Sequence, residues 1–244
     1  GDVDVFSATL DDSHLNLYVN GGPGNPEDFG DAIVIIGEDD DGDYLDAPMS
    51  VYAIDVDGDD EVDVIYADEG AELVRYFAQG STASDWSSSP IEIDDGRGEP
   101  RWVVAADLDG DGDADVLCAD PDEEEIVVYE NEDAPGDGSS WDDQSYDADG
   151  KVLSVELFDV DGDGDLDFVG AVEDKMVWWK RAGGALDEGE GDDDDAAFVK
   201  DGFTVDADAE EDMTTVVALD IDADGDLDVV AAETNKLTWY ENDC

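Results

Sequence analysis

The chain has 244 residues, enough for one or two ordinary domains, and 41% of them are hydrophobic, so a buried core can form. It carries 74 acidic residues against 9 lysines and arginines, a formal charge of −65, which argues against nucleic acid and anionic membrane surfaces as partners. No apolar run approaches the ~18 residues of a spanning helix, and we see no signal-peptide pattern, so we expect no membrane insertion.

The composition nevertheless predicts a folded protein. The chain contains 6 Trp, 8 Tyr and 7 Phe, whereas an acidic disordered tail would be poor in aromatic residues. Charge repulsion on such a surface is relieved by molar salt, so we expect a halophilic or marine source. Bound divalent cations would relieve the same repulsion, and the two explanations are compatible.

Short β-branched runs recur along the chain between Gly, Asp and Ser residues, with no sustained helical periodicity. We therefore predict strands and almost no helix. Each unit has an apolar run on either side of an acidic loop, then a run that ends in an aromatic residue, then a weaker fourth run. We expect one repeat domain, 1–244, with approximate units 1–50, 51–101, 102–151, 152–212 and 213–244, of which the first lacks its beginning and the last its end.

The acidic loops have the same nine-residue pattern in four copies. Asp occupies the first, third, fifth and ninth positions, and Asp or Glu the seventh. The four loops span residues 55–63, 107–115, 159–167 and 220–228. A fifth, partial copy lies at the start, where Gly1–Val5 matches Gly112–Val116. We interpret a chain that starts and stops within a repeat as part of a longer array.

Four short strands in a unit of this length are typical of a propeller blade. A single sheet cannot bury both of its faces, and stacking sheets face to face solves that problem. We therefore predict an all-β fold, a β-propeller of four-stranded antiparallel blades, with about four to five blades present in part of a larger ring or array. The aromatic residues that end each third run should pack between blades, and these are Tyr18, Tyr76, Tyr129, Trp179 and Tyr240.

The acidic loops contain the candidate metal ligands. Carboxylates two residues apart on a tightly turning segment can converge on one centre, and Ca²⁺ takes six to eight hard oxygen ligands. Zinc would need Cys or His, and magnesium a smaller octahedron. We predict about four complete calcium sites and a fifth, partial one, and Asp113 is expected to contribute its backbone carbonyl. The predicted ligands are Asp55, Asp57, Asp59, Glu61, Asp63, Asp107, Asp109, Asp111, Asp113, Asp115, Asp159, Asp161, Asp163, Asp165, Asp167, Asp220, Asp222, Asp224, Asp226 and Asp228, with Asp2 and Asp4 in the partial site.

Two other interpretations of the loops fit the sequence less well. An EF-hand would need an oxygen ligand at position twelve and flanking helices, but that position holds Tyr66, Cys118, Gly170 and Ala231. Acidic turns that merely connect strands are the simpler alternative, yet four copies with the same five acidic positions would leave strong mutual repulsion without a cation. Asp60 and Ala223 replace glycines of the other loops, and we expect weaker sites there.

The repeat resembles the FG-GAP or VCBS repeat of integrin-α-like propellers, through the loops, Phe168–Ala171 and the Trp-Tyr-Glu-Asn run at 239–242. This resemblance implies a calcium-stabilised propeller, often of seven blades, that is extracellular or on the cell surface and serves adhesion, ligand binding or scaffolding. Five units fall short of seven, which leaves ring closure open.

No catalytic or organic-cofactor site is predicted. The single histidine, His14, is expected at a hairpin tip, and no carboxylate pair stands out for acid–base work. We expect a non-enzymatic scaffold; a lectin-like module that binds glycan or protein, or a self-assembling subunit of a filament or surface layer, remains an alternative. Cys118 is expected to be buried, and the sequence leaves open whether it pairs with Cys244.

Overall fold

The structure is a computed structural model, and it describes residues 3–10, 13–21, 29–36, 45–94, 96, 98–132, 138–183, 186, 197–206 and 213–242. These residues form 18 strands and no helix, in agreement with the sequence prediction. Within them there is accordingly no helix long and apolar enough to cross a membrane.

The strands form five antiparallel sheets, numbered here in chain order. The first sheet contains β1 (Val5–Thr9), β2 (His14–Tyr18) and β3 (Ile33–Ile36). The second contains β4 (Pro48–Ile54), β5 (Asp63–Asp68), β6 (Leu73–Phe77) and β7 (Ile91–Asp94). The third contains β8 (Trp102–Ala106), β9 (Asp115–Asp120), β10 (Glu125–Asn131) and β11 (Trp141–Asp147). The fourth contains β12 (Val152–Phe158), β13 (Asp167–Val172), β14 (Lys175–Arg181) and β15 (Phe198–Asp206). The fifth contains β16 (Met213–Leu219), β17 (Asp228–Glu233) and β18 (Leu237–Tyr240).

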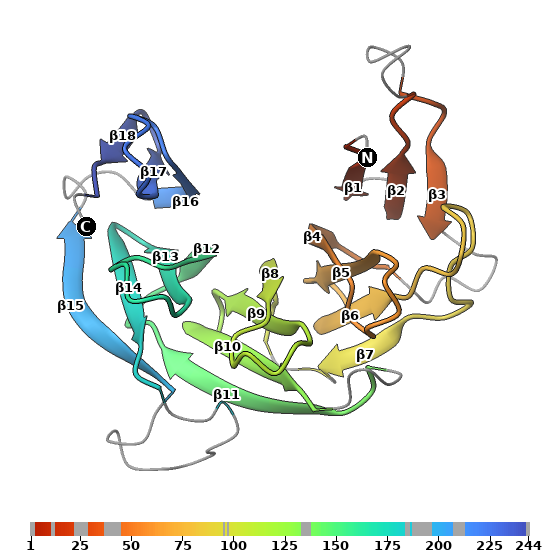
Figure 1. The fold of residues 1–244 in the computed structure, drawn as a ribbon, viewed down its shortest axis with the longest axis horizontal. Coiled ribbons are helices and arrows are strands. Elements are labelled where there is room, and N and C mark those ends of the chain that lie inside the picture. The colour runs from red at the N-terminus through yellow and green to blue at the C-terminus, as the bar shows by residue number, and fades with distance from the viewer. Residues whose placement is uncertain are drawn as a thin grey trace.

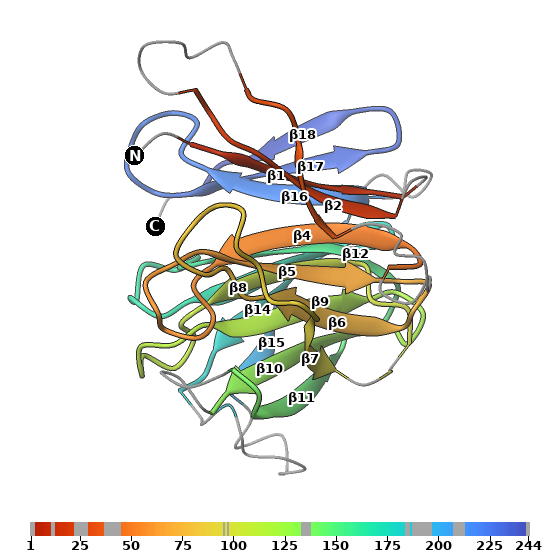
Figure 2. The same ribbon diagram turned by 90° about the vertical axis from the view of Figure 1, so that its right-hand side faces the viewer.

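Within every sheet the strands follow one another in chain order. Three sheets have the four strands that the sequence predicts for a blade, and the first and fifth have three described strands each. Figure 1 shows the five sheets side by side in an open arc, with the first and fifth sheets at its two ends. Figure 2, turned by 90°, shows strands β4, β5, β6 and β7 of the second sheet one below another, with β4 uppermost. The first strands line the inner side of the arc, where β4 contacts β1 and β8, and β12 contacts β8 and β16.

The hydrophobic core lies between neighbouring sheets rather than inside any one of them. Four clusters of buried side chains fill the four junctions, as expected for stacked repeats that contact mainly their neighbours. The largest lies between the third and fourth sheets, where the rings of Phe168 and Trp179 stack with centroids 5.1 Å apart. Tyr76, Tyr129 and Trp179 are buried at these junctions, which confirms the predicted packing role for them.

The second strand of the inner sheets is covered on both faces. Every residue of β5, β9 and β13 is buried. Near-continuous apolar sequence is what such a doubly covered strand requires. Each of these strands nevertheless begins with an aspartate, at Asp63, Asp115 and Asp167. The fold therefore carries the last residue of each acidic loop into the protein interior.

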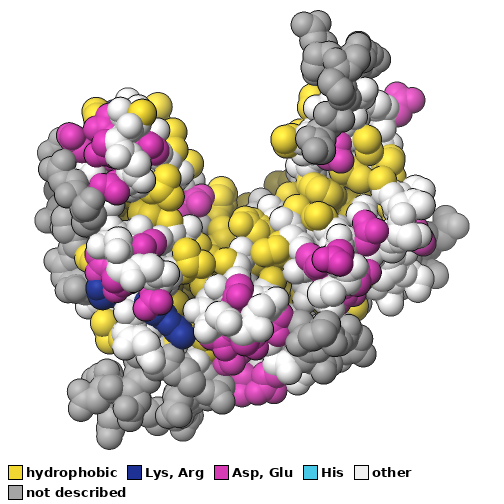
Figure 3. All heavy atoms as spheres, viewed as in Figure 1, with side chains coloured by type: hydrophobic (Ala, Val, Ile, Leu, Met, Phe, Trp, Pro, Cys, Tyr) yellow, Lys and Arg dark blue, Asp and Glu magenta, His cyan; other side chains and the backbone are white. Residues whose placement is uncertain are grey.

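Acidic and apolar side chains separate on the surface. Figure 3 shows apolar side chains along the inner side of the arc and acidic side chains over the loops and outer side of the face in view. Cys118 is buried on β9, as predicted, and burial raises the pKa of its thiol. Cys244 lies outside the described residues, so its pairing stays open.

Candidate metal centre

The four acidic loops join the first strand of a sheet to its second strand. They connect β4 to β5, β8 to β9, β12 to β13 and β16 to β17. Because the strands are antiparallel, each loop reverses the chain over a few residues, which favours tight turns. All four loops thus occupy the same place in their sheets.

Three carboxylates converge in each loop, with one oxygen of each within 4.8 Å of the others. In three loops these are the first, third and ninth residues: Asp55, Asp57 and Asp63; Asp107, Asp109 and Asp115; Asp159, Asp161 and Asp167. In the last loop the group consists of Asp220, Asp222 and Asp224, the first, third and fifth residues. The convergence expected from the spacing is therefore present, although for fewer carboxylates per loop than predicted.

The ninth aspartate is the structural anchor of the loop. Asp115 has no measurable exposure, and its two oxygens accept backbone N–H groups from Leu108 at 2.8 Å and Asn131 at 3.0 Å. The ninth aspartate of each other loop accepts the same pair of bonds. One donor is in the loop itself, and the other is in the third strand or just after it. These aspartates are Asp63, Asp167 and Asp228. This carboxylate is consequently held in place by the backbone before any ion binds.

Asp4 occupies the same place in the first sheet. Its Oδ1 accepts the backbone N–H of Asn20 at 2.7 Å, which is the bond that Asp115 accepts from Asn131. The predicted match of the N-terminal segment with residues 112–116 is thus supported by geometry at Asp4. Asp2 lies outside the described residues.

The first aspartate shapes the turn. Asp159 accepts the backbone N–H groups of Gly162 and Gly164 at 2.8 and 2.9 Å, and Asp55 accepts those of Gly58 and Asp60 at 2.9 Å. The fourth and sixth loop positions have positive φ, a conformation that favours glycine. Asp60 and Ala223 adopt it without being glycine, with φ of 71° and 64°. The two departures from the motif thus place a side chain where the positive φ favours glycine.

The fifth and seventh residues contribute differently. The fifth carboxylate accepts the backbone N–H of the seventh residue in each loop, for example Asp111 from Asp113 at 3.2 Å. In the first three loops the fifth residue does not belong to the converging group. These fifth residues are Asp59, Asp111 and Asp163. The seventh carboxylates do not belong to the converging groups either, at Glu61, Asp113, Asp165 and Asp226. The proposed carbonyl ligand of Asp113 stays a prediction.

The electrostatics favour a cation. Burial raises the pKa of Asp63 to about 6 and that of Asp115 to about 7. Burial, followed by the neighbouring Asp111, raises the pKa of Asp113 to about 7. Oδ1 of Asp57 is buried and has no hydrogen-bond partner. Carboxylates that are desolvated, close together and left with an unpartnered oxygen fit a hard divalent cation, because the cation offsets both penalties.

Comparison with known proteins identifies the repeat. The FG-GAP-like repeat family matches residues 55–118 and 107–170, and each match begins at the first aspartate of a loop. Residues 55–170 belong to the FG-GAP-like repeat family. Together with the five sheets, this assigns the chain to the propeller-like, all-β repeat class. No curated protein matches the sequence.

A solved structure supports the same architecture. The chain is similar to a lectin of Agrocybe aegerita that recognises non-reducing terminal N-acetylglucosamine, with a TM-score of 0.51 and 17% identity. The similarity covers 94% of this chain and 60% of the lectin chain, so the chain corresponds to part of the lectin's length. At this identity the likeness concerns the fold alone.

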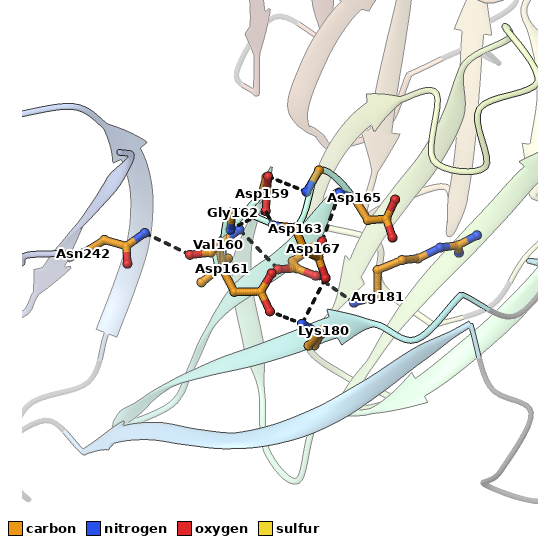
Figure 4. A network of polar contacts seen from close by, with 11 residues as sticks. Asp159, Val160, Asp161, Gly162, Asp163, Asp165, Asp167, Lys180, Arg181 and Asn242 are labelled. Atoms are coloured by element: carbon orange, nitrogen blue, oxygen red, sulfur yellow. Dashed lines mark hydrogen bonds and ion pairs between the residues drawn. The ribbon is translucent and has the colours of Figure 1, made fainter. Parts of the chain in front are cut away.

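Sequence reasoning missed two sets of residues beside the FG-GAP-like loops. Asn131 and Asn242 each donate a side-chain N–H to a loop of the preceding sheet, at the carbonyls of Val56 (3.0 Å) and Val160 (2.9 Å). Lys180, on β14, forms ion pairs with Asp161 and Asp163 of loop 159–167, as Figure 4 shows. The recurring Tyr-Glu-Asn of 129–131 and 240–242 signalled the first set, but nothing local to the loop signalled the second.

Proposed function

We propose that the protein is a calcium-binding propeller repeat module of an extracellular or cell-surface protein, with a structural or adhesive role and no enzymatic activity. The observation that carries the proposal is the convergence of the first, third and ninth carboxylates in loops 55–63, 107–115 and 159–167. Three side chains would supply part of the calcium shell, and backbone carbonyls and water would complete it.

A bound ion would stabilise the fold in a simple way. The ninth carboxylate starts a buried central strand, whereas the first and third lie on the turn. An ion shared by these groups would tie the turn to the interior of the sheet. Because the unfolded chain lacks the arrangement, calcium binding free energy would add to folding free energy.

The test compares thermal melts in calcium and in chelator, each at low and at molar sodium chloride. We expect chelation to lower Tm by about 10 °C or more at both salt concentrations, since several sites contribute. The matched variants are Asp107→Asn with Asp109→Asn, against the control Asp142→Asn with Asp143→Asn on β11. The loop pair should reduce the calcium-dependent gain, and the control pair should not. A Tm that chelator leaves unchanged would refute calcium as a structural ion.

Glycan binding is a second candidate, favoured by one cavity. A space of about 280 Å³ lies at the junction of the second and third sheets, lined by residues that include Asp94, Tyr129, Trp141 and Asp143. Tyr129 Oη donates to Asp94 at 2.8 Å, and Trp141 Nε1 donates to the carbonyl of Gly138 at 2.8 Å. Aromatic rings beside carboxylates are suited to the apolar faces and hydroxyl groups of a sugar ring.

Calorimetric titration with N-acetylglucosamine, the sugar of the similar lectin, tests this candidate. We expect saturable binding that Trp141→Ala abolishes and Trp86→Ala leaves intact. Trp86 is the matched control because it stands at the corresponding place before β7 but packs edge-on against Phe6, with ring centroids 6.2 Å apart. Equal binding by both variants would exclude the cavity as a sugar site.

A further inference from the structure

A lysine from a neighbouring strand places its ammonium group against the carboxylates of loop 159–167. Lys180 lies near the end of β14, and its Nζ pairs with Asp161 Oδ2 and, at 3.0 Å, with Asp163 Oδ2 (Figure 4). The lysine side chain is 29% exposed and that of Asp161 23% exposed, so the ion pair is largely covered. Asp161 is a member of the converging group of this loop. The ammonium therefore engages a carboxylate that a metal ion would need.

The position of Lys180 is defined by the fold. The residue that follows it, Arg181, donates its backbone N–H to the ninth aspartate at 2.7 Å. The corresponding donors in the other sheets identify the equivalent positions. These are occupied by Val19, Ala78, Glu130 and Glu241. Of the five equivalent residues, one is a cation, two are apolar and two are acids.

The general composition does not explain a lysine here. The chain has 9 lysines and arginines against 74 acidic residues, so composition alone does not favour a lysine beside an acidic loop. An ordinary exposed ion pair would contribute little. Lys180, however, contacts two carboxylates of one loop, and Oδ1 of Asp161 is buried without a hydrogen-bond partner.

An ammonium in this place has two physical consequences for an incoming ion. It pairs with Oδ2 of Asp161, so calcium must either displace the ammonium or bind this carboxylate through Oδ1 alone. It also adds a positive charge next to a dication, which is repulsive at these distances. In the absence of metal, the same ammonium offsets the repulsion among the loop carboxylates.

We propose that Lys180 is the built-in cation of loop 159–167, which keeps this loop folded without metal and lowers its calcium affinity below that of loop 107–115. The predicted effect of Lys180 on calcium affinity rests on the proposed function. The predicted stability of the loop without metal does not. The chain then contains two kinds of loop: loops whose order depends on calcium, and one that is partly independent of it.

Calorimetric calcium titration of the wild type, Lys180→Gln and Lys175→Gln tests the affinity. Lys175 is the matched control because it lies on the same strand and loses the same charge, but its Nζ bonds the carbonyl of Asp149, away from the loop. We expect Lys180→Gln to raise the affinity of one site about tenfold, as for the loss of one close like-charge contact. Lys175→Gln should leave the isotherm unchanged.

Thermal melts of the same proteins in chelator test the stability without metal. Lys180→Gln should lower Tm more than Lys175→Gln does, and saturating calcium should restore it to the wild-type value or above. An isotherm that Lys180→Gln leaves unchanged, or a chelator melt in which the two variants coincide, overturns the role of Lys180. Failure of the wild type itself to bind calcium instead overturns the proposed function, and the chelator melt still decides whether Lys180 stabilises the loop.

The reciprocal variant places an ammonium in another loop. Glu130→Lys puts a lysine at the equivalent position beside loop 107–115, with Glu130→Gln as the control for loss of the acid. We expect the lysine variant to bind calcium at this loop about tenfold more weakly than the glutamine variant. Equal affinities of the two variants would show that a cation at this position does not compete with calcium.

Discussion

Loops 107–115 and 159–167 differ in sequence only at their two apolar positions, yet their surroundings differ in charge. Both contain glycine at the fourth and sixth positions and both bring the first, third and ninth carboxylates together. Loop 159–167 faces the ammonium of Lys180, whereas the equivalent residue for loop 107–115 is Glu130. The comparison shows that these two loops bring the same carboxylates together, while a residue on another strand sets the charge that an ion meets.

The largest effect is expected where the two loops are alike. Asp115→Ala and Asp167→Ala should each lower the free energy of unfolding by about 3 kcal/mol, because two backbone N–H groups lose their acceptor in a buried place. The loss should appear in calcium and in chelator, as measured by urea denaturation. Asp109→Ala is the contrast: as a proposed calcium ligand with an exposed side chain, it should matter mainly in calcium. A cost for Asp115→Ala that vanishes in chelator would mean that the residue acts only as a ligand.

The pH dependence of the metal-free protein should reveal the buried carboxylates. An unfolded aspartate has a pKa of about 3.9, whereas the folded values are about 6 for Asp63 and about 7 for Asp115. Between these values the folded state binds more protons, so stability should fall as pH rises from about 4 to 7. Thermal melts in chelator across this range measure the trend. Calcium should oppose it, because the ion favours the ionised carboxylates.

The pH experiment also sharpens the comparison of the two loops. Asp115→Asn should reduce the decline in stability between pH 4 and 7, since it removes a group with a raised pKa. The pKa of Asp167 is also raised by burial. A decline that is the same in the wild type and in Asp115→Asn would indicate that other carboxylates carry it.

A moderate effect is expected from the hydrogen bonds that join loops to the next sheet. Asn131 is buried, and its side chain bonds loop 55–63; Asn242 does the same for loop 159–167. Asn131→Ala should cost about 1–2 kcal/mol in urea denaturation, and Asn242→Ala, which is partly exposed, about 1 kcal/mol. The opposite order would mean that the fifth sheet depends more strongly on this contact than the third.

The smallest effect concerns the backbone of the last loop. Ala223 has φ of 64°, where the equivalent positions hold Gly58, Gly110 and Gly162. Ala223→Gly should therefore stabilise the protein by roughly 0.5–1 kcal/mol, since glycine adopts positive φ without a steric penalty. The reverse change, Gly110→Ala, has open space for the added methyl group and tests the backbone alone, with an expected loss of about 1 kcal/mol. A loss on Ala223→Gly would show that chain entropy outweighs strain here.

The sequence by itself determined the repeat, the absence of helix from the described residues, and the loop positions of the first, third and ninth aspartates. These features are local: alternation of strands and turns, and spacing of two residues between carboxylates, follow from a few neighbouring residues. The predicted inter-blade packing of Tyr76, Tyr129 and Trp179 also followed from the period of the repeat.

The tertiary structure alone decided the rest. Burial of Asp115 depends on sheets that cover β9 from both sides, and its second bond comes from Asn131, 16 residues away. Lys180 reaches Asp161 across 19 residues because β13 and β14 pair in one register. The carboxylate of Asp111 accepts the backbone N–H of Asp113, and Asp111 does not belong to the converging group of its loop. Motif spacing states which carboxylates can meet, but strand pairing and sheet stacking decide which of them do, and beside which charge.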